Sequence, residues 1–456
     1  MTTLHEHLLR WVPRQRWYAN KSGPSALTEI GRCALPSGDP AAAVSIHLLL
    51  DTGGVLFQVP ITTRHTALPA ADAALVGVSG PDFYYDAPHD PAFAAALVAL
   101  MFEQAAADDP AGGCTVRGTA LTRLPARRLV GSRVLRGEQS NTSIVLDLVD
   151  DTGASGIPVI CKLFRVLHAG ENPDVAVQCA LSAAGSRYVP TPVGHLTGHW
   201  RGADGPVQGH VAFAQEFLPD VQDAWRVALA AAEAGEDFTG RAHALGTATA
   251  SVHRDLARAF PTEAATPALV SGLIDGMLRR YRTACGEVPA LAEFAAAVET
   301  IFQDARSPQW PPLQRIHGDF HLGQVLDAPG RGWMLIDFEG EPLRPMEERA
   351  RPDAALRDVA GMLRSLSYVA GTVALSGHDP AAAEAWAAAA RRSFLGGYAA
   401  ASGEDLERQH RILDALELDK AIYEVRYEAR NRPSWLPIPL TAVRRLVGMP
   451  YQAPRP

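Results

Sequence analysis

The sequence lacks a long apolar run. The longest nearly uninterrupted one, from Ala92 to Phe102, is about half of the ~20 residues that a membrane-spanning helix needs. The first residues, with His5, Glu6 and His7, also lack the basic region and apolar stretch of a secretory signal. We therefore expect a protein that does not associate with a membrane.

Cysteine is scarce and scattered. The chain has five cysteines, an odd number with no C-x-x-C pair among them: Cys33, Cys114, Cys161, Cys179 and Cys285. This pattern fits neither a disulfide framework nor a zinc site. It is typical of free thiols in a reducing compartment, which predicts a cytoplasmic protein.

Positive charge is also in short supply. The 42 lysines and arginines are outnumbered by 50 acidic residues, which gives a net charge of −8. Nucleic acid needs a basic face, so we expect none as a partner. Small anions need only a local cation and remain allowed. The 456 residues, at roughly 150 per domain, predict about three folding units.

The first half of the chain has the pattern of two β-rich units. Residues 44–50 and 55–61 read as strands joined by the hairpin turn Asp51-Thr-Gly-Gly54. A helix is expected over 91–107. A second β-rich unit follows, with strands at 143–149, 159–164 and 211–217 and a helix from 174 to about 184.

The second half has the apolar period of helices. Two short β-like pieces interrupt it, at 313–316 and 333–338. We expect two lobes with a cleft between them, plus an N-terminal addition. The predicted helices are 224–233, 240–259, 271–284, 381–401 and 406–430.

The chemistry concentrates in Arg315-Ile-His-Gly-Asp-Phe-His-Leu-Gly-Gln-Val-Leu326 and Trp333-Met-Leu-Ile-Asp-Phe-Glu-Gly340. Asp319 and Asp337 each follow a β-like run, and Gln324 lies between them. Phosphoryl transfer needs one carboxylate to accept a hydroxyl proton and hard oxygen ligands for Mg²⁺ on the nucleotide. Asp319 suits the first role, and Gln324 with Asp337 suits the second.

Each carboxylate has an ordinary alternative, because aspartate commonly ends a strand in a turn. The three residues together at this spacing favour the chemical interpretation. A structural role explains His317 better than a chemical one, and His321 is interpreted in the same way, as a residue that orients Asp319. Glu339 fits a second metal ligand and a structural bridge equally.

This H-G-D-x-H-x-x-Q-x-L…D-F-E pattern resembles the aminoglycoside phosphotransferase and protein-kinase-like superfamily, and in detail the actinobacterial maltokinases and glucosamine kinases. The resemblance covers almost the whole chain. It implies an α+β, bilobal protein-kinase-like fold, with a cap subdomain (1–90), a nucleotide-binding β-rich subdomain (91–218) and a helical catalytic and acceptor-binding lobe (219–456). The supporting stretches are Arg14-Gln-Arg-Trp-Tyr18, Gly137-Glu-Gln-Ser-Asn-Thr-Ser143, Asn172-Pro-Asp174, Arg357-Asp-Val-Ala-Gly361 and Tyr423-Glu424 with Arg430-Asn-Arg-Pro-Ser-Trp-Leu-Pro437.

The resemblance implies ATP as phosphoryl donor and Mg²⁺ as cofactor. The loop before residue 143 would cradle phosphates through Ser140, Asn141 and Thr142, although an ordinary hairpin also fits it. Lys162, inside an apolar strand, is best explained by a phosphate partner. The segment that would hold adenine between the lobes contains Gln215, Glu216, Phe217 and Leu218.

Two positions depart from the maltokinase pattern. Ala176 stands where that family carries an acid to pair the strand lysine, so either Glu171 or Asp174 substitutes or Lys162 contacts phosphate alone. Ala19-Asn20-Lys21 also differs from the Ala-Gly-Arg expected in maltokinases. Both departures point away from maltose as the acceptor.

The acceptor site is expected around Asp319, His321, Glu424 and Trp435, because sugar pockets combine carboxylates with an aromatic face. A solvated acidic helix face with Trp435 in the core explains the last two equally well. We expect glucosamine, phosphorylated on its 6-hydroxyl. Maltose, phosphorylated on its 1-hydroxyl, is the alternative, and an aminoglycoside phosphotransferase or an inactive pseudokinase fits less well. The sequence does not indicate the oligomeric state.

Overall fold

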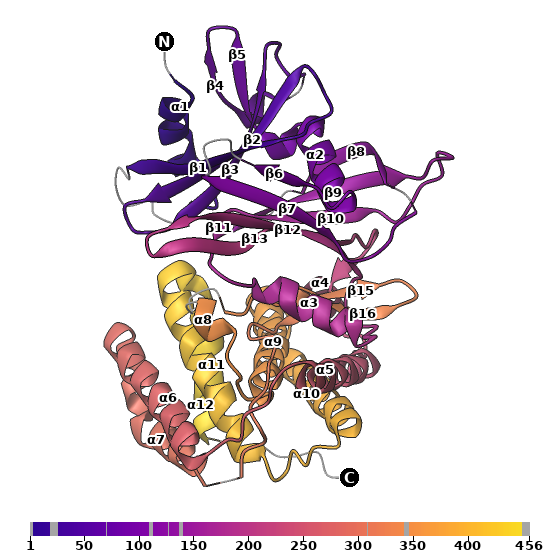
Figure 1. Ribbon diagram of the computed structural model, residues 1–456. Helices are drawn as coiled ribbons and strands as arrows, with labels where there is room; N and C mark the ends of the chain where they lie inside the picture. Colours follow the sequence, from indigo (N-terminus) through magenta and orange to yellow (C-terminus); the bar gives the residue numbers. More distant parts are fainter. Residues whose placement is uncertain are drawn as a thin grey trace. The chain divides into compact units, whose positions relative to one another are not determined.

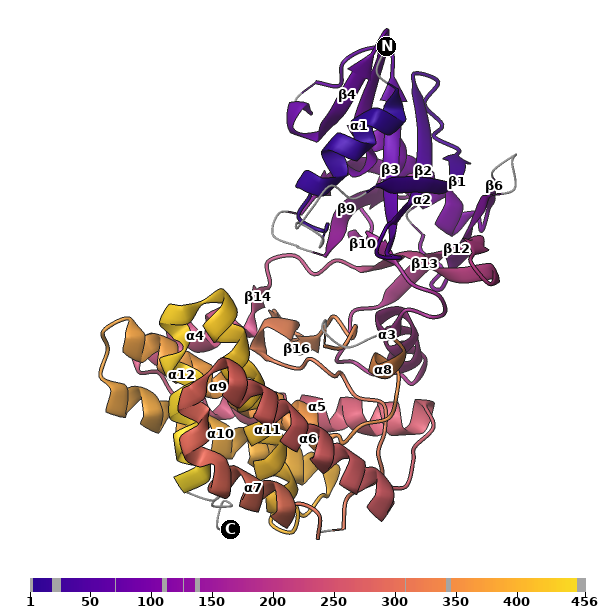
Figure 2. The same cartoon turned by 90° about the vertical axis from the view of Figure 1, so that its left-hand side faces the viewer.

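The computed structural model describes residues 3–18, 26–69, 71–108, 113–125, 127–135, 140–307, 309–341 and 346–448. The chain divides into two compact units (Figures 1 and 2). Unit 1 comprises residues 1–176 and 190–219, and unit 2 comprises residues 177–189 and 220–456. Each unit is described by itself.

Unit 1 is built on two antiparallel sheets, drawn in indigo to magenta in Figure 1. The described strands of the first run in the order β1-β2-β3-β5-β4, with β11 paired to β3. Those of the second run β6-β7-β12-β13-β10-β9-β8. The bounds are β1 Leu27–Leu35, β2 Ala42–Asp51, β3 Leu56–Arg64, β4 Leu75–Ser79, β5 Asp82–Asp86, β6 Ala106–Asp108, β7 Cys114–Ala120, β8 Arg128–Val134, β9 Asn141–Val149, β10 Val159–Phe164, β11 Val166–Leu167, β12 Pro192–Gly202 and β13 Gly205–Glu216.

The predicted first hairpin is confirmed as β2–β3. The carboxylate of Asp51 accepts the N–H groups of Gly53 and Val55, each at 2.8 Å, and Gly54 takes φ +82° to close the turn. The strands place apolar side chains on a core that also packs helix α1 (Leu4–Trp11), with Leu8, Tyr18 and Phe57 buried in it. Strand β3 is buried at consecutive positions from Leu56 to Thr62, so both of its faces are covered.

The helix predicted over 91–107 is shorter than expected. Helix α2 runs Pro91–Phe102, and Asp90 caps it by accepting the N–H of Ala92 at 2.9 Å. The chain then turns at Gln104 with φ +51°, and β6 pairs with β7. The alanines of 105–107 continue the helical composition, but edge pairing in the second sheet determines their conformation.

Unit 2 is mainly helical and carries the small sheet β14-β15-β16. Its core is formed largely by the long helices, and the predicted helices are confirmed with small shifts of their ends. Helix α9 is buried over most of its length and was not among the predicted helices. The bounds are β14 Gln222–Asp223, β15 Val325–Ala328, β16 Gly332–Leu335, α4 Ala224–Ala234, α5 Thr239–Ala259, α6 Pro267–Glu287, α7 Ala295–Asp304, α8 Met346–Arg349, α9 Leu356–Leu375, α10 Pro380–Ser402, α11 His410–Asn431 and α12 Pro437–Gly448, with α3 (Pro173–Ala183) crossing from unit 1.

One predicted β piece is wrong. Residues 313–316 make only isolated bridges, Leu313 with Glu263 and Gln314 with Asp353. The run is apolar because it is buried under helices and not because it belongs to a sheet. The other predicted piece, 333–338, is confirmed in part as β16. The sheet-rich first unit and helical second unit confirm the predicted α+β class.

Among the described residues, each helix is too short or too polar to cross a bilayer.

Candidate active site

Asp358 at the start of α9 holds the loop that carries Asp319. Its carboxylate accepts the backbone N–H of His317 at 2.8 Å and that of Gly318 at 2.9 Å. Gly318 has φ +85°, a conformation that glycine adopts without strain. On the other side of the loop, a β-carbon on Gly361 of α9 would lie 2.5 Å from the carbonyl oxygen of Phe320. The loop is therefore fixed closely against α9.

The ring of His253 on α5 completes this arrangement. Its Nε2 lies 3.0 Å from Asp358 Oδ2, and its Nδ1 lies 3.0 Å from the hydroxyl of Tyr398. Burial alone raises the pKa of the Asp358 carboxyl, but the hydrogen bond and charge of His253 and the bond from Gly318 hold that pKa below its usual range. Asp358 is thus an ionised anchor inside the core.

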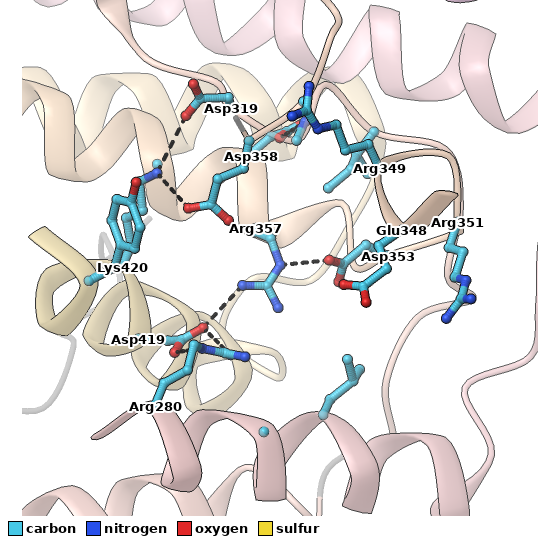
Figure 3. Close-up of a pocket in the computed structure, with 18 of the residues that line it drawn as sticks. Arg280, Asp319, Glu348, Arg349, Arg351, Asp353, Arg357, Asp358, Asp419 and Lys420 are labelled. Carbon is cyan, nitrogen blue, oxygen red and sulfur yellow. Dashed lines mark hydrogen bonds and ion pairs between the residues drawn. The ribbon is translucent and has the colours of Figure 1, made fainter. Parts of the chain in front are cut away.

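Asp319 projects into a cavity of about 630 Å³ in unit 2 (Figure 3). This volume lies within the range of about 300–1,000 Å³ that is typical of small-molecule sites. The cavity is strongly charged, since its lining includes Glu341, Arg349 and Lys420. Lys420 Nζ lies 3.5 Å from Asp319 Oδ1.

Paired charges form another wall of the same cavity. Arg280 contacts Asp419 at 2.7 Å, Arg357 contacts the same carboxylate at 3.2 Å, and Arg357 also contacts Asp353 at 2.8 Å (Figure 3). Burial raises the pKa of Asp419, yet the two guanidinium groups outweigh it and hold the pKa below its usual range. This wall is rigid and electrically compensated.

Gln324 and Asp337 come together at the end of the β15–β16 hairpin. Gln324 Nε2 lies 3.2 Å from Asp337 Oδ2, and the N–H of Ile336 donates to the Gln324 carbonyl at 3.0 Å. Asp337 adopts φ +64°, an uncommon conformation for a residue with a side chain, and residues in such conformations cluster at active sites. The structure therefore brings these two predicted residues into one place.

Arg349 on α8 lies in the field of the same acids. Burial lowers the pKa of its guanidinium, while the charges of Glu339, Asp319 and Asp337 act in the opposite direction. Its β-carbon and stem pack against Gly340, whose φ is +75°. Sequence analysis did not single out Arg349.

The two loop histidines differ in role. His317 Nε2 donates to the carbonyl of Ile336 at 3.0 Å, and its ring packs on Phe338 with centroids 4.6 Å apart, as expected of a residue that holds the loop. His321 Nδ1 accepts the N–H of Gly323 at 3.0 Å and so caps the turn that leads to Gln324. Burial lowers the pKa of the His321 ring. Its proposed action on Asp319 stays a prediction.

Helix α11 supplies the cavity with residues other than the expected one. Lys420 and Tyr423 line it, whereas Glu424 pairs with the buried Arg364 at 2.8 Å. Burial raises the pKa of Glu424 against the pull of Arg364. Trp435 lies beyond the end of α11 with the guanidinium of Arg432 4.5 Å from its ring centroid. Acceptor contacts by Glu424 and Trp435 stay predictions.

In unit 1, Lys162 on β10 has an acidic partner. Its Nζ lies 3.3 Å from Asp174 Oδ2, with the carboxylate 2% exposed. Asn172 accepts the N–H of Asp174 at 2.8 Å and caps α3, which begins at Pro173. Asp174 therefore pairs with Lys162 in place of the acid that is missing at Ala176. This was the first of the two alternatives that the sequence left open.

The candidate phosphate loop is partly described. Gly137, Glu138 and Gln139 lie outside the described residues, as do Ala19, Asn20 and Lys21. Ser140 is exposed, Asn141 is half-buried and begins β9, and Thr142 is buried.

The Thr142 hydroxyl accepts a hydrogen bond of 2.8 Å from Arg165 Nε. The other end of this guanidinium binds both oxygens of Asp86 in the first sheet, at 2.8 and 2.9 Å. The buried Arg165 thus ties the loop strand to the predicted cap.

The segment predicted to hold adenine ends β13. Two of its N–H groups are engaged within unit 1, because Glu216 donates to the carbonyl of Thr191 and Phe217 to that of Pro158, both at 2.8 Å. Gln215 lies between β10 and β12 in the sheet, and Leu218 is buried. Any adenine contact must therefore use other groups of the segment, and this role stays a prediction.

Comparison with known proteins identifies the family. Residues 134–403, more than half of the chain, match the phosphotransferase enzyme family. The chain belongs to this family. It is therefore a phosphotransferase, and the predicted resemblance is confirmed. Residues 11–90 of this phosphotransferase also match the maltokinase N-terminal cap domain.

Individual relatives agree with the assignment. The phosphotransferase is 32% identical to the glucosamine kinase of Streptacidiphilus jiangxiensis over an alignment of 369 residues, which covers 73% of this chain and 82% of the relative. It is also 32% identical to the glucosamine kinase of Mycolicibacterium smegmatis over an alignment of 339 residues, which covers 69% of this chain and 81% of that protein.

A solved structure of a glucosamine kinase, crystal form B, has the same fold. It aligns with a TM-score of 0.69 at 24% identity, covering 98% of this chain and all of the other.

Proposed function

We propose that this phosphotransferase is an ATP-dependent sugar kinase that transfers the γ-phosphoryl group to the 6-hydroxyl of glucosamine. The observation that carries the proposal is the similarity, over most of the chain, to two glucosamine kinases. A structure described as a glucosamine kinase with glucosamine, ADP and inorganic phosphate also aligns with this chain, at 24% identity. The cavity beside Asp319 supplies a place for such an acceptor.

Asp319 is the proposed general base. With its Oδ1 beside Lys420, the second carboxylate oxygen is left to accept the proton of the acceptor hydroxyl as that oxygen attacks phosphorus. Asp358 accepts the backbone N–H groups of His317 and Gly318, and these hydrogen bonds fix the position of the loop that carries Asp319. Direct in-line transfer from ATP to the sugar needs no phosphorylated enzyme.

The donor set at Gln324 and Asp337 fits Mg²⁺. One amide and one carboxylate oxygen are hard ligands, and the two side chains lie side by side, with 3.2 Å between Gln324 Nε2 and Asp337 Oδ2. The amide would present its oxygen rather than its nitrogen, a choice that hydrogen-bond networks decide. The bound ion would neutralise charge on the nucleotide phosphates.

Lys162 is proposed to bind a phosphate of ATP, with Asp174 fixing its direction. We expect Lys162→Met to raise the KM for ATP at least ten-fold, because a charged partner of phosphate is lost. Asp174→Asn, which leaves the lysine unguided, should raise KM by a smaller factor. Steady-state kinetics with varied ATP would measure both. An unchanged KM in Lys162→Met would contradict the phosphate role.

Maltose is the second candidate acceptor, and the match of residues 11–90 to the maltokinase N-terminal cap domain favours it.

The cap is proposed to stiffen the nucleotide-binding β-rich part of unit 1. Arg165 supports that view, since it joins Asp86 of the first sheet to Thr142 of the second.

A coupled ATP-consumption assay over glucosamine, glucose, maltose and N-acetylglucosamine tests the proposal. We expect ADP release with glucosamine to exceed that with each other sugar, and the product to be glucosamine 6-phosphate by NMR. A higher kcat/KM with maltose would assign the chain to the second candidate instead. An aminoglycoside in the same panel tests whether the protein phosphorylates an antibiotic. No ADP release with any of these compounds would indicate an inactive kinase fold.

A further inference from the structure

Lys420 occupies a specific position at the catalytic carboxylate. It comes from α11, and its ammonium lies 3.5 Å from Asp319 Oδ1 (Figure 3). The same ammonium lies 3.9 Å from Glu341 Oε1. The same ammonium lies 4.9 Å from the ring centroid of Tyr423, one turn further along the helix. Its side chain is 27% exposed and lines the cavity.

Two carboxylates and an aromatic face are the groups that proteins use to recognise an ammonium. Here they surround an ammonium that the chain itself supplies. Burial alone would lower the pKa of Lys420, but Asp319 and Glu341 outweigh burial, and the pKa is raised. The lysine is therefore charged at neutral pH.

An acceptor bound for attack by its hydroxyl must approach Asp319. If that acceptor carries its own ammonium, as glucosamine does on C2, the two ammonium groups lie about one sugar ring apart and share the same acids. Repulsion between two like charges at that separation (~7 Å), at an effective dielectric constant of about 20, lowers the affinity by a few tens-fold. A neutral sugar meets no such repulsion.

We propose that Lys420 is a specificity-determining residue that disfavours cationic acceptors, and that Glu341 opposes it by favouring them. The balance of these two charges sets the selectivity between amino sugars and neutral sugars. The inference rests on the proposed function only in taking the cavity at Asp319 as the acceptor site. It holds whether the preferred acceptor is glucosamine or maltose.

The test compares the dissociation constants of glucosamine and glucose by calorimetry on the full chain with ADP, at about pH 6, where an amine of this kind is protonated. We expect Lys420→Met to shift the ratio toward glucosamine at least ten-fold. Glu341→Gln should shift the ratio the other way. Lys420→Arg, which keeps the charge, should leave it within about three-fold of the wild-type ratio.

The ratio of the glucosamine and glucose affinities cancels any effect that a variant has on both sugars alike, including a loss of order at the Asp319 side chain. Opposite shifts from Lys420→Met and Glu341→Gln are what a purely structural role would not produce. Equal ratios in wild type and Lys420→Met, or undetectable glucosamine binding by that variant, would overturn the proposal. If the wild type binds but does not phosphorylate glucosamine, the proposed function fails and the binding ratio still decides the role of Lys420.

Discussion

Replacing Asp319 by asparagine is expected to lower kcat by about three orders of magnitude, within the 10²–10⁴-fold that a positioned general base contributes. Asparagine has nearly the same shape but cannot accept the hydroxyl proton. The loop that carries it stays anchored by Asp358, and so the fold is preserved. Binding of ADP, measured by calorimetry, should change by less than about three-fold, because the role proposed for this carboxylate is on the acceptor and not on the nucleotide.

Asp327 provides the matched control. It lies on β15 in the same region of the chain, and its carboxylate pairs with Arg241 at 2.6 Å away from the loop contacts of Asp319. Asp327→Asn makes the same chemical change in a half-exposed ion pair, whose loss costs little. Its kcat should equal that of the wild type. Turnover near the wild-type rate in Asp319→Asn would remove Asp319 from the mechanism.

Local patterns in the sequence were sufficient to predict much of the fold and to single out the loop that carries Asp319. The turn of the hairpin at Asp51–Gly54 is formed by residues within four positions of one another. The amphipathic helices are predicted by the spacing of their apolar residues. Asp319, Gln324 and Asp337 lie within 19 residues of sequence, counted from 319 to 337, and their order matches a known pattern. Patterns as short as these can be recognised in a single sequence.

The residues that sequence analysis missed act over long separations. Lys420 meets Asp319 across 101 positions, and Asp358 meets Gly318 across 40. A lysine between acids on a helix is indistinguishable, in sequence, from an ordinary exposed charge. Lys420 comes close to Asp319 only because α11 packs near the loop that carries Asp319. The same reason explains residues 313–316, where burial under helices imitates the composition of a strand.

Asp358→Asn is expected to destabilise the fold by about 3 kcal/mol, the order found when a buried charged network loses one partner. The native carboxylate accepts three hydrogen bonds, from the N–H groups of His317 and Gly318 and from His253. The amide of asparagine offers one oxygen, and its NH₂ group must face at least one of these donors. Urea unfolding followed by circular dichroism would measure the loss. The kcat should also fall, because the loop of Asp319 is released.

The pH dependence separates the charge of Asp358 from its shape. Its folded pKa lies below its unfolded value of about 4, so it contributes stability that is present above that value and is lost as pH falls through the folded pKa. The stability difference between wild type and Asp358→Asn should therefore be constant near neutral pH and shrink below about pH 4.

Tyr398→Phe removes only the hydroxyl at the far nitrogen of His253 and leaves Asp358 and the loop in contact. It should cost about 1 kcal/mol, the usual value of one buried hydrogen bond, and leave kcat unchanged. An equal loss of kcat in Tyr398→Phe and Asp358→Asn would mean that general destabilisation, and not release of the loop, lowers activity. A kcat loss confined to Asp358→Asn would instead establish this carboxylate as the residue that positions the catalytic loop.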